Sequence, residues 1–473
     1  MDYKTILEKY IDDHAEEMVA DTMELCRIRS VKGEAEEGKP FGKGPYEALM
    51  KAQEICGRYG FATKSYDNCV VAADMNDKER HLDILAHMDV VPEGEGWTVT
   101  KPYEPVEKDG NIYGRGTSDD KGPAMAALYA MRAVKECGVS VTKNCRLLLG
   151  SDEECGSADL PHYYAKEPEA AMTFTPDAEF PLVNAEKGQF RADITKQFAP
   201  SDGGAVLLGL AAGTATNIVP GRASFDVRGV SQADLEAACT RVTGETGVKF
   251  EIESMNEGIS LTETFHVEVY GKGAHASLPD GGKNAALAAL KLVTELPLAD
   301  CGQLAAAKAL LKLFPYGDNC GEALGIKRSE PVTGGTTVSL NILNISETEL
   351  SARFDSRSCI GADEENMVKP AAQKMEEAGF SVKTTFNPPH AVDADSPFVK
   401  TLLQCYEAVT GEKGRAIGIG GGTYVHDLER GVAFGAVGEF TDTHMHGANE
   451  FMPIEELKTA AKIYALSIAE LCR

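Results

Sequence analysis

Residues 82–89 read Leu-Asp-Ile-Leu-Ala-His-Met-Asp, an apolar run that ends on a histidine and an aspartate. Two further apolar runs end in the same way: residues 145–150 precede Asp152, Glu153 and Glu154, and residues 171–175 precede Asp177. Short apolar runs of this length are typical of buried strands, and α/β folds place their functional side chains at the carboxyl ends of strands. We therefore predict three strands of an α/β sheet whose carboxyl ends share one site.

Two more segments add side chains that bind metal ions. The glycine-rich segment 114–122 contains Asp119 and Asp120, and Thr-His-Met-His at 443–446 contains His444 and His446. Histidine nitrogens and carboxylate oxygens are usual ligands of zinc and related divalent ions. Together the segments offer enough ligands for two ions, with a further carboxylate beside them. Each segment alone also has a structural explanation, such as a helix cap or a solvated turn.

Within this set, two pairs of residues indicate a division of roles. His87 and Asp89 are two residues apart and share a face of a strand end, so Asp89 can accept the second ring proton of a metal-binding His87. Glu153 and Glu154 are adjacent carboxylates, which repel each other unless a cation compensates them. One of them can bind a metal while the other accepts a proton from metal-bound water.

The chain is long enough for two domains, and its pattern changes twice. It has 473 residues, 43% of them hydrophobic. A chain of this length is too long to fold around one ordinary hydrophobic core. Residues 1–186 alternate helices and strands, with the clearest helices at 45–59 and 121–137. Residues 387–473 return to this pattern. We predict that these two parts form one α/β catalytic domain, with a mainly parallel mixed sheet flanked by helices, and that residues 187–386 form an inserted α+β lid domain.

The predicted insert contains a faint internal repeat. Ala-Ser-Phe-Asp-Val-Arg at 223–228 recurs as Ala-Arg-Phe-Asp-Ser-Arg at 352–357, and acidic helical segments follow at 231–242 and 362–377. Two short matches can also arise by chance. If the repeat is genuine, the lid consists of two similar β-α-β halves.

The composition argues against several classes of partner. Its 73 acidic and 47 basic residues give a formal charge of −26, which repels nucleic acid and anionic lipid. No apolar run approaches bilayer length, and the first 27 residues lack the basic start and apolar middle of a signal peptide. The twelve cysteines include no Cys-x-x-Cys pair, which favours free thiols in a reducing compartment. We expect a cytoplasmic protein that binds small molecules and metal cations.

The chain resembles the dinuclear-zinc aminoacylase, desuccinylase and carboxypeptidase family of metallopeptidases in six segments, which occur in the family's order. They are Ala-His-Met-Asp-Val-Val-Pro at 86–92, the glycine-rich 114–122, Ser-Asp-Glu-Glu at 151–154, Thr-Pro-Asp-Ala-Glu-Phe-Pro at 175–181, residues 271–279, and His-Gly-Ala-Asn-Glu at 446–450. Within the family, the chain is most similar to PepV-type dipeptidases. The match extends from about residue 80 to residue 452.

The resemblance implies a set of metal ligands. His87 and Asp177 would hold one ion, Glu154 and His446 would hold the other, and Asp119 would bridge them. Zinc is favoured by the two histidines, while the three carboxylates leave manganese and cobalt as alternatives.

The resemblance also implies the residues around the metals. Glu153 would be the general base, and Asp89 would be the partner of the metal-binding histidine. His444 lies two residues before His446, and strand alternation would place both on one face. The His-x-Ala-Asn-Glu match selects His446 as the ligand.

Substrate-binding residues follow from the same comparison. His275 would reach the substrate carbonyl oxygen, and Asn217 and Arg357 would contact the substrate's carboxyl end. Arg353 competes with Arg357, which occupies the Asp-x-Arg position. Backbone N–H groups near the substrate carboxylate would come from a glycine-rich turn containing Gly421, Gly422 and Thr423.

The implied reaction is hydrolysis of a short peptide, most simply an unblocked dipeptide, by a water that bridges two metal ions and loses its proton to Glu153. One alternative is an N-acyl- or succinyl-amino-acid amidohydrolase with the same centre. A second is a catalytically silent relative that binds peptides or metal, although binding alone does not require Glu153. Smaller relatives carry one lid unit and dimerise through it, whereas this chain carries two copies of the repeat, so we expect an active monomer.

Overall fold

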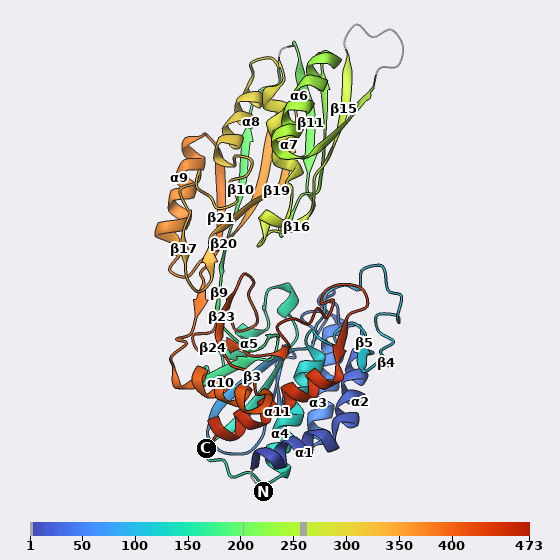
Figure 1. Ribbon diagram of the computed structural model, residues 1–473, viewed down its shortest axis with the longest axis vertical. Helices are drawn as coiled ribbons and strands as arrows, with labels where there is room; N and C mark the ends of the chain where they lie inside the picture. Colours follow the sequence, from blue (N-terminus) through green and yellow to red (C-terminus); the bar gives the residue numbers. More distant parts are fainter. Residues whose placement is uncertain (1–2, 202, 256–262) are drawn as a thin grey trace. The chain divides into compact units, whose positions relative to one another are not determined.

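The computed structural model describes residues 3–201, 203–255 and 263–473. Its chain divides into two compact units: unit 1 comprises Met1–Ala185 and Ala391–Arg473, and unit 2 comprises Glu186–His390. Unit 2 is therefore an insertion between two parts of unit 1 that are distant in sequence (Figure 1). That these units are a catalytic domain and an inserted lid domain, with boundaries after residues 186 and 386, stays a prediction.

A nine-stranded mixed sheet forms the centre of unit 1. Its four central strands run parallel, in the order β6 (Asn144–Gly150), β3 (Arg80–His87), β7 (Met172–Thr175) and β24 (Gly431–Ala433). The outer strands are β1 (Ala62–Tyr66), β2 (Val70–Asp74), β9 (Leu182–Glu186), β22 (His390–Ala391) and β23 (Ala416–Ile419). Strand β1 pairs antiparallel with β2, as do β2 with β6 and β9 with β24. The sheet is therefore mixed, and its parallel part is the centre.

Helices cover one face of this sheet. Helices α4 (Lys121–Glu136) and α11 (Ile454–Leu471) pack against each other over it, as Figure 1 shows. The same core includes α1 (Tyr3–Asp13), α2 (Ala15–Cys26), α3 (Lys43–Arg58) and α10 (Pro397–Thr410). The helices predicted at 45–59 and 121–137 are α3 and α4. Because α5 (Leu160–Tyr164) and loops cover the opposite face, β3 and β6 carry buried apolar side chains on both faces.

Short elements complete unit 1 near the ends of the central strands. They are β4 (Val106–Lys108), β5 (Asn111–Tyr113), the 3₁₀ helix η1 (Glu153–Cys155), β8 (Ala178–Glu179), β25 (Ala436–Val437) and β26 (Phe451–Pro453). Strand β26 pairs with β5, and β25 pairs with β8.

Unit 2 is built on an eight-stranded antiparallel sheet. Its order is β14 (Lys249–Ser254), β15 (Thr264–Tyr270), β13 (Arg222–Arg228), β11 (Val206–Ala212), β19 (Thr337–Ile345), β20 (Glu349–Ser358), β10 (Gly188–Gln197) and β21 (Ser381–Asn387). One face packs against α6 (Gln232–Thr246), α7 (Ala285–Glu295), α8 (Gly302–Leu313) and α9 (Lys369–Glu377). The strands alternate accordingly: Phe190, Ala192 and Ile194 are buried, while Arg191 points to the opposite face and is only partly buried.

The two copies of the sequence repeat occupy equivalent places in this sheet. They lie in β13 and β20, which flank the central pair β11 and β19. The first copy is followed by α6 and the edge strand β14. The second is followed by η3 (Glu364–Val368), α9 and the other edge strand, β21. The predicted lid of two similar halves is therefore confirmed. Smaller elements are β12 (Ile218–Val219), β16 (Ala274–His275), η2 (Pro279–Gly281), β17 (Ser329–Glu330) and β18 (Gly334–Gly335).

All twelve cysteines are free thiols, as their spacing predicts. None of the helices in the described part of the chain combines the length and apolar character that crossing a bilayer requires.

Candidate metal centre

The three predicted strand ends meet at one edge of the unit 1 sheet. The strands predicted from the apolar runs at 82–89, 145–150 and 171–175 are β3, β6 and β7, and β3 runs parallel to both of the others as their neighbour. Strand β3 ends at His87, β6 leads into η1 with Glu153 and Glu154, and β7 is followed by Asp177. Because carboxyl ends of neighbouring parallel strands lie together, these side chains gather in one place.

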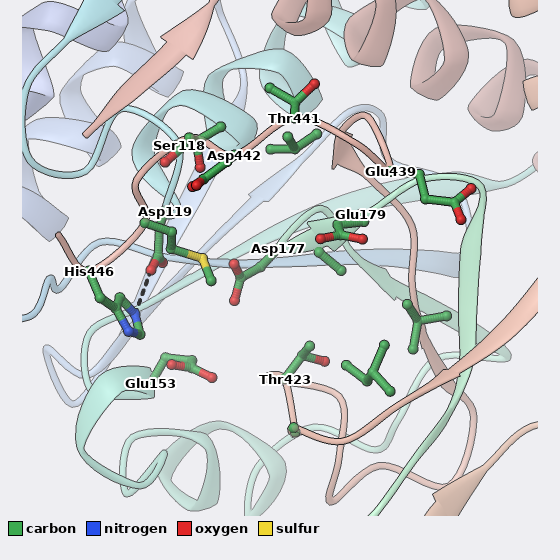
Figure 2. Close-up of a pocket in the computed structure, with 18 of the residues that line it drawn as sticks. Ser118, Asp119, Glu153, Asp177, Glu179, Thr423, Glu439, Thr441, Asp442 and His446 are labelled. Carbon is green, nitrogen blue, oxygen red and sulfur yellow. Dashed lines mark ion pairs between the residues drawn. The ribbon is translucent and has the colours of Figure 1, made fainter. Parts of the chain in front are cut away.

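Asp119 lies between the two histidines that the sequence singles out. It belongs to the loop before α4, and its Oδ1 is 3.0 Å from His87 Nε2. Its Oδ2 is 2.9 Å from His446 Nε2 (Figure 2). One carboxylate thus presents a separate oxygen to each histidine, which is the arrangement that a bridging ligand requires.

Each histidine also lies near a second carboxylate. His87 Nε2 is 3.6 Å from Asp177 Oδ2, and His446 Nε2 is 3.4 Å from Glu154 Oε2. Other groupings of the same residues are also tight: ligand atoms of His87, Asp119 and Glu154 lie within 4.8 Å of one another, as do those of His87, Glu153 and Asp177. The assignment of individual carboxylates to two separate ions therefore stays a prediction, which the histidine distances favour.

Asp89 supports the cluster in a way that differs from the sequence-based expectation. His87 Nδ1 lies 3.0 Å from the main-chain carbonyl oxygen of Asp89 and 3.5 Å from its carboxylate. The carboxylate instead accepts hydrogen bonds from the N–H groups of Glu153 at 3.2 Å and Glu154 at 3.1 Å. N–H groups at the start of a helix lack partners within the helix, which explains why they attract the carboxylate. Asp89 therefore holds both His87 and the adjacent glutamates.

The neighbouring Asp120 and Lys121 have structural roles that the sequence does not reveal. Asp120 is fully buried, and its Oδ2 accepts a hydrogen bond from the main-chain N–H of His87 at 3.1 Å. Lys121 is also buried and donates to the carbonyl oxygens of Leu25 and Ile28 at 3.2 and 2.9 Å. Of the two aspartates that could bridge two ions, Asp119 is the one placed between the histidines.

The prediction that His444 and His446 share one strand face is wrong. Residues 444–450 form a loop, and both histidines have positive φ values, 56° and 62°. The N–H of Gly447 donates to the carbonyl oxygen of His444, which closes a turn between them. The His444 ring packs edge-on against Phe451, while His446 approaches Asp119. The turn explains why alternation fails here.

Burial and like charge dominate the electrostatics of the cluster. Burial, with repulsion from neighbouring carboxylates, raises the pKa of Glu153 and Asp177 and raises the pKa of Glu154 to about 7. Burial also opposes ionisation of Asp119, but contacts with the histidines outweigh it and hold that pKa well below its usual range. Hydrogen bonds to Asp119 and Glu154 raise the pKa of His446 to about 11. The site therefore strongly favours positive charge.

The donor atoms fit divalent metal ions. His87 Nε2 and Glu154 Oε1 are buried and make no hydrogen bond within the described part of the chain. Asp119 Oδ1 lies close to His87 Nε2, but the two atoms do not form a hydrogen bond. Buried polar atoms almost always have a partner, so these two atoms indicate a ligand. Imidazole nitrogen and carboxylate oxygen suit zinc, manganese or cobalt.

A cavity of about 680 Å³ adjoins the cluster within unit 1. Figure 2 shows Asp119, Glu153, Asp177 and His446 around it. The predicted substrate-binding residues Gly421, Gly422 and Thr423 also line it. Tyr424 anchors the end of this turn, because its hydroxyl donates to Asp159 and its ring lies edge-on to His87, 6.0 Å between centroids.

The far wall of the cavity is also acidic. Figure 2 shows Glu179 and Glu439 on the opposite side of the cavity from His446, whereas Asp442 lines the cavity near Ser118 and Asp119. Glu439 forms an ion pair with Arg415. No lysine or arginine occurs among the described residues that line the cavity. Its rim includes an exposed aromatic side chain, Phe440, which is 94% exposed.

The remaining predicted residues lie in unit 2. Strand β12 pairs with β16, so that Ile218 lies opposite His275, and the N–H of Ala276 donates to the carbonyl oxygen of Asn217 at 2.8 Å. Unit 2 thus brings Asn217 and His275 together, and His275 Nδ1 lies 2.6 Å from Ser277 Oγ.

The two candidate arginines differ in their surroundings. Arg357 is largely buried, and its Nε donates to Asp355 Oδ1 at 2.9 Å. Asp355 also accepts from Gln189. Arg353 is more exposed and pairs with Asp193. The predicted roles of these residues in substrate binding stay predictions.

Comparison with known proteins gives matches over nearly the whole chain. Residues 84–470 match the model of peptidase family M20/M25/M40. The Beta-Ala-Xaa dipeptidase of Lactobacillus delbrueckii subsp. lactis is 34% identical over 466 residues, which cover 96% of each chain. Human carnosine dipeptidase 1 has a similar fold, with a TM-score of 0.60, 15% identity, and coverage of 100% of this chain and 99% of that one. An M20 family metallo-carboxypeptidase from Sulfolobus solfataricus gives a TM-score of 0.59 at 19% identity, over 96% and 99% of the two chains.

Proposed function

The chain belongs to peptidase family M20/M25/M40, and we propose that it is a metal-dependent dipeptidase that hydrolyses dipeptides with a free amino end and a free carboxylate. The family match confirms the resemblance that the ordered sequence motifs indicate. The relative that is 34% identical over 96% of both chains is named a dipeptidase, which supports the choice of substrate.

The observation that carries the proposal is the position of Asp119 between His87 and His446, with Asp177 beside the first histidine and Glu154 beside the second. These residues would hold two divalent ions with Asp119 as the bridge. Zinc is the preferred metal, with manganese and cobalt as alternatives. Two such ions would supply Lewis acidity and lower the pKa of a bound water.

Glu153 is the proposed general base. Its main chain is fixed by the Asp89 carboxylate, and its side chain lines the cavity beside the proposed ligands. In this position it can accept the proton of the attacking water and return it to the leaving amine. A protein that only binds peptides would not need this carboxylate next to the ligand Glu154.

The substrate's two ends would be bound by different parts of the chain. Asn217 and Arg357, from unit 2, would bind the carboxylate together with N–H groups of the turn that contains Gly421, Gly422 and Thr423. His275 would donate a hydrogen bond to the carbonyl oxygen as negative charge develops there. Closure of unit 2 over unit 1 would bring these residues to the substrate and exclude water.

The acidic wall of the cavity favours a dipeptidase over an acyl-amino-acid amidohydrolase. Two divalent ions would balance the four carboxylates Asp119, Glu153, Glu154 and Asp177, which leaves Glu179 on the far wall without a counter-charge, next to Glu439 with its partner Arg415. Such a wall attracts the ammonium group of an unblocked peptide and repels a succinyl carboxylate.

We also propose that the protein is cytoplasmic and acts as a monomer. Twelve free thiols and a charge of −26 suit a reducing, aqueous compartment without nucleic acid or anionic membrane as partner. The two similar halves of unit 2 support a site completed within one chain. Light scattering during turnover tests this: a dimer that loses activity as it dissociates on dilution would contradict it, whereas a fully active 50.6 kDa species would support it.

Hydrolysis of L-alanyl-L-alanine by the metal-free chain, before and after addition of zinc, manganese or cobalt, tests the function itself. We expect activity only with metal, and its loss on chelation. Hydrolysis that continues in the metal-free chain, or a metal-loaded chain that cleaves acyl-amino acids but no dipeptide, would contradict the proposal.

A further inference from the structure

A buried ion pair joins two loops of the candidate metal centre. Arg115 Nη1 lies 2.5 Å from Glu450 Oε2, and both side chains are only 1% exposed. The two residues are far apart in the sequence, and each lies close to a proposed ligand: Arg115 precedes Asp119 and Glu450 follows His446. A buried pair of this kind is weak evidence for stability, since removing two charges from water is costly. Its contacts indicate a different role.

Glu450 fixes the loop that carries Asp119. Its Oε1 accepts hydrogen bonds from the N–H of Gly116 at 3.0 Å, from the N–H of Ser118 at 3.1 Å and from the Ser118 hydroxyl at 3.2 Å. Its own carbonyl oxygen accepts from the N–H of Gly114 at 2.9 Å. Because Ser118 directly precedes Asp119, these bonds fix the main chain from which the proposed bridging side chain extends.

Arg115 extends the connection to the loop that carries His446. Its Nη2 approaches the main-chain carbonyl oxygens of Pro92, Glu93 and His446, each at 3.3 Å, as a donor. Its guanidinium group lies 5.5 Å from the centre of the Trp97 ring. Only a planar group with several fixed N–H donors can reach a carboxylate and these carbonyl oxygens at once, so lysine cannot replace it.

The two histidines depend on this pair to different degrees. His87 ends strand β3, is fully buried, and is held independently by Asp120 and by the carbonyl oxygen of Asp89. His446 lies in a loop, has a φ of 62°, and its side chain is 51% exposed. Its carbonyl oxygen is one of the groups that Arg115 holds. Loss of the ion pair should therefore displace His446 far more than His87.

We propose that Arg115 and Glu450 are positioning residues that set the spacing between Asp119 and His446, and so determine the affinity for the metal ion on the His446 side. This inference rests on the proposed function, because it assumes two ions. It assigns the pair no contact with substrate or metal.

Stepwise zinc binding to the full-length chain, measured by equilibrium dialysis with metal analysis, tests the inference. In Glu450→Gln we expect one of the two binding steps, that of the ion on the His446 side, to weaken about 10- to 100-fold, as is usual when groups that orient metal ligands are removed. Affinity for the other ion should fall less, because His87 is held independently of the pair. Peptide hydrolysis should return when the zinc concentration is raised, since every proposed ligand and Glu153 are still present.

A matched control separates positioning from general stability. Arg146 and Asp74 form a partly buried pair in unit 1, with N–O distances of 2.8 and 3.0 Å, which touches no proposed ligand loop. Asp74→Asn should lower the melting temperature without changing the affinity for either ion. Arg115→Lys provides a second variant, which should reproduce the Glu450→Gln pattern.

The outcomes are distinguishable. Wild-type affinity for both ions in folded Glu450→Gln and Arg115→Lys would overturn the inference, as would equal losses at both ions or the same loss in Asp74→Asn. A wild-type chain that binds fewer than two ions would instead overturn the proposed function on which the inference rests.

Discussion

Acetylation of the substrate's amino end should strongly reduce hydrolysis, because it removes the positive charge that the acidic cavity wall would bind. Glu179 lines this wall and forms no ion pair with any residue that the structure describes. Glu439 already pairs with Arg415, so it contributes less. Acetylation leaves the scissile bond and the carboxylate unchanged, which confines the perturbation to the amino end.

The expected magnitude follows from one lost charge-assisted hydrogen bond. Such a bond contributes about 1.5–3 kcal/mol, so kcat/KM for N-acetyl-L-alanyl-L-alanine should be about 10- to 100-fold below that for L-alanyl-L-alanine. Glu179→Gln preserves the size of the side chain but removes its charge. It should therefore reduce the difference between the two substrates.

The assay compares kcat/KM for both peptides at saturating metal in the wild type, in Glu179→Gln and in a control, Glu104→Gln. Glu104 is an exposed carboxylate outside the cavity. Equal rates for the two peptides in the wild type would refute the reasoning. If Glu179→Gln leaves the ratio of the two kcat/KM values unchanged, Glu179 does not bind the ammonium group of the substrate.

Three further predictions concern other residues. Glu153→Ala should retain two bound ions and lose about 10²- to 10⁴-fold in kcat, the usual contribution of a general base, and near-normal turnover with full metal content would reject that role. Arg357→Met should impair cleavage of peptides with a free carboxylate far more than cleavage of their C-terminal amides, whereas equal losses would make Arg353 the next candidate. Burial raises the pKa of Asp83 from 3.8 to about 7, so the folded state binds a proton that the unfolded state has already lost, and the free energy of unfolding should fall as the pH rises through this interval. Asp83→Asn should remove that contribution in urea unfolding measured across the interval, and an unchanged pH slope would contradict it.

The parts of the fold that follow local patterns could be predicted from the sequence. Strands β3 and β6 are largely apolar because they pack on both faces, and the carboxyl ends of β3, β6 and β7 carry or lead into the polar residues that form the site. The repeat in the insert predicts two similar halves, since each copy forms the same strand in an equivalent place. Both signals are contained in short segments, so no knowledge of distant contacts is needed.

The features that the sequence does not reveal depend on contacts between distant segments or on loop geometry. Glu450 receives hydrogen bonds from Ser118, 332 residues earlier, which no local pattern predicts. The hydrogen bond from His87 Nδ1 goes to the main-chain carbonyl oxygen of Asp89, because the Asp89 carboxylate accepts from two N–H groups of η1. The turn between His444 and His446 defeats the strand alternation that the sequence favours.

The most direct test of the proposed metal centre is the number of zinc ions bound per chain, measured alongside dipeptide hydrolysis during titration of the metal-free wild type and of Asp119→Ala. The structure places one Asp119 oxygen near each histidine, so we predict two ions and full activity in the wild type. In Asp119→Ala we predict weakened binding at both positions and little activity. Two ions still tightly held in Asp119→Ala, or full wild-type activity with one ion per chain, would contradict a bridged two-metal centre.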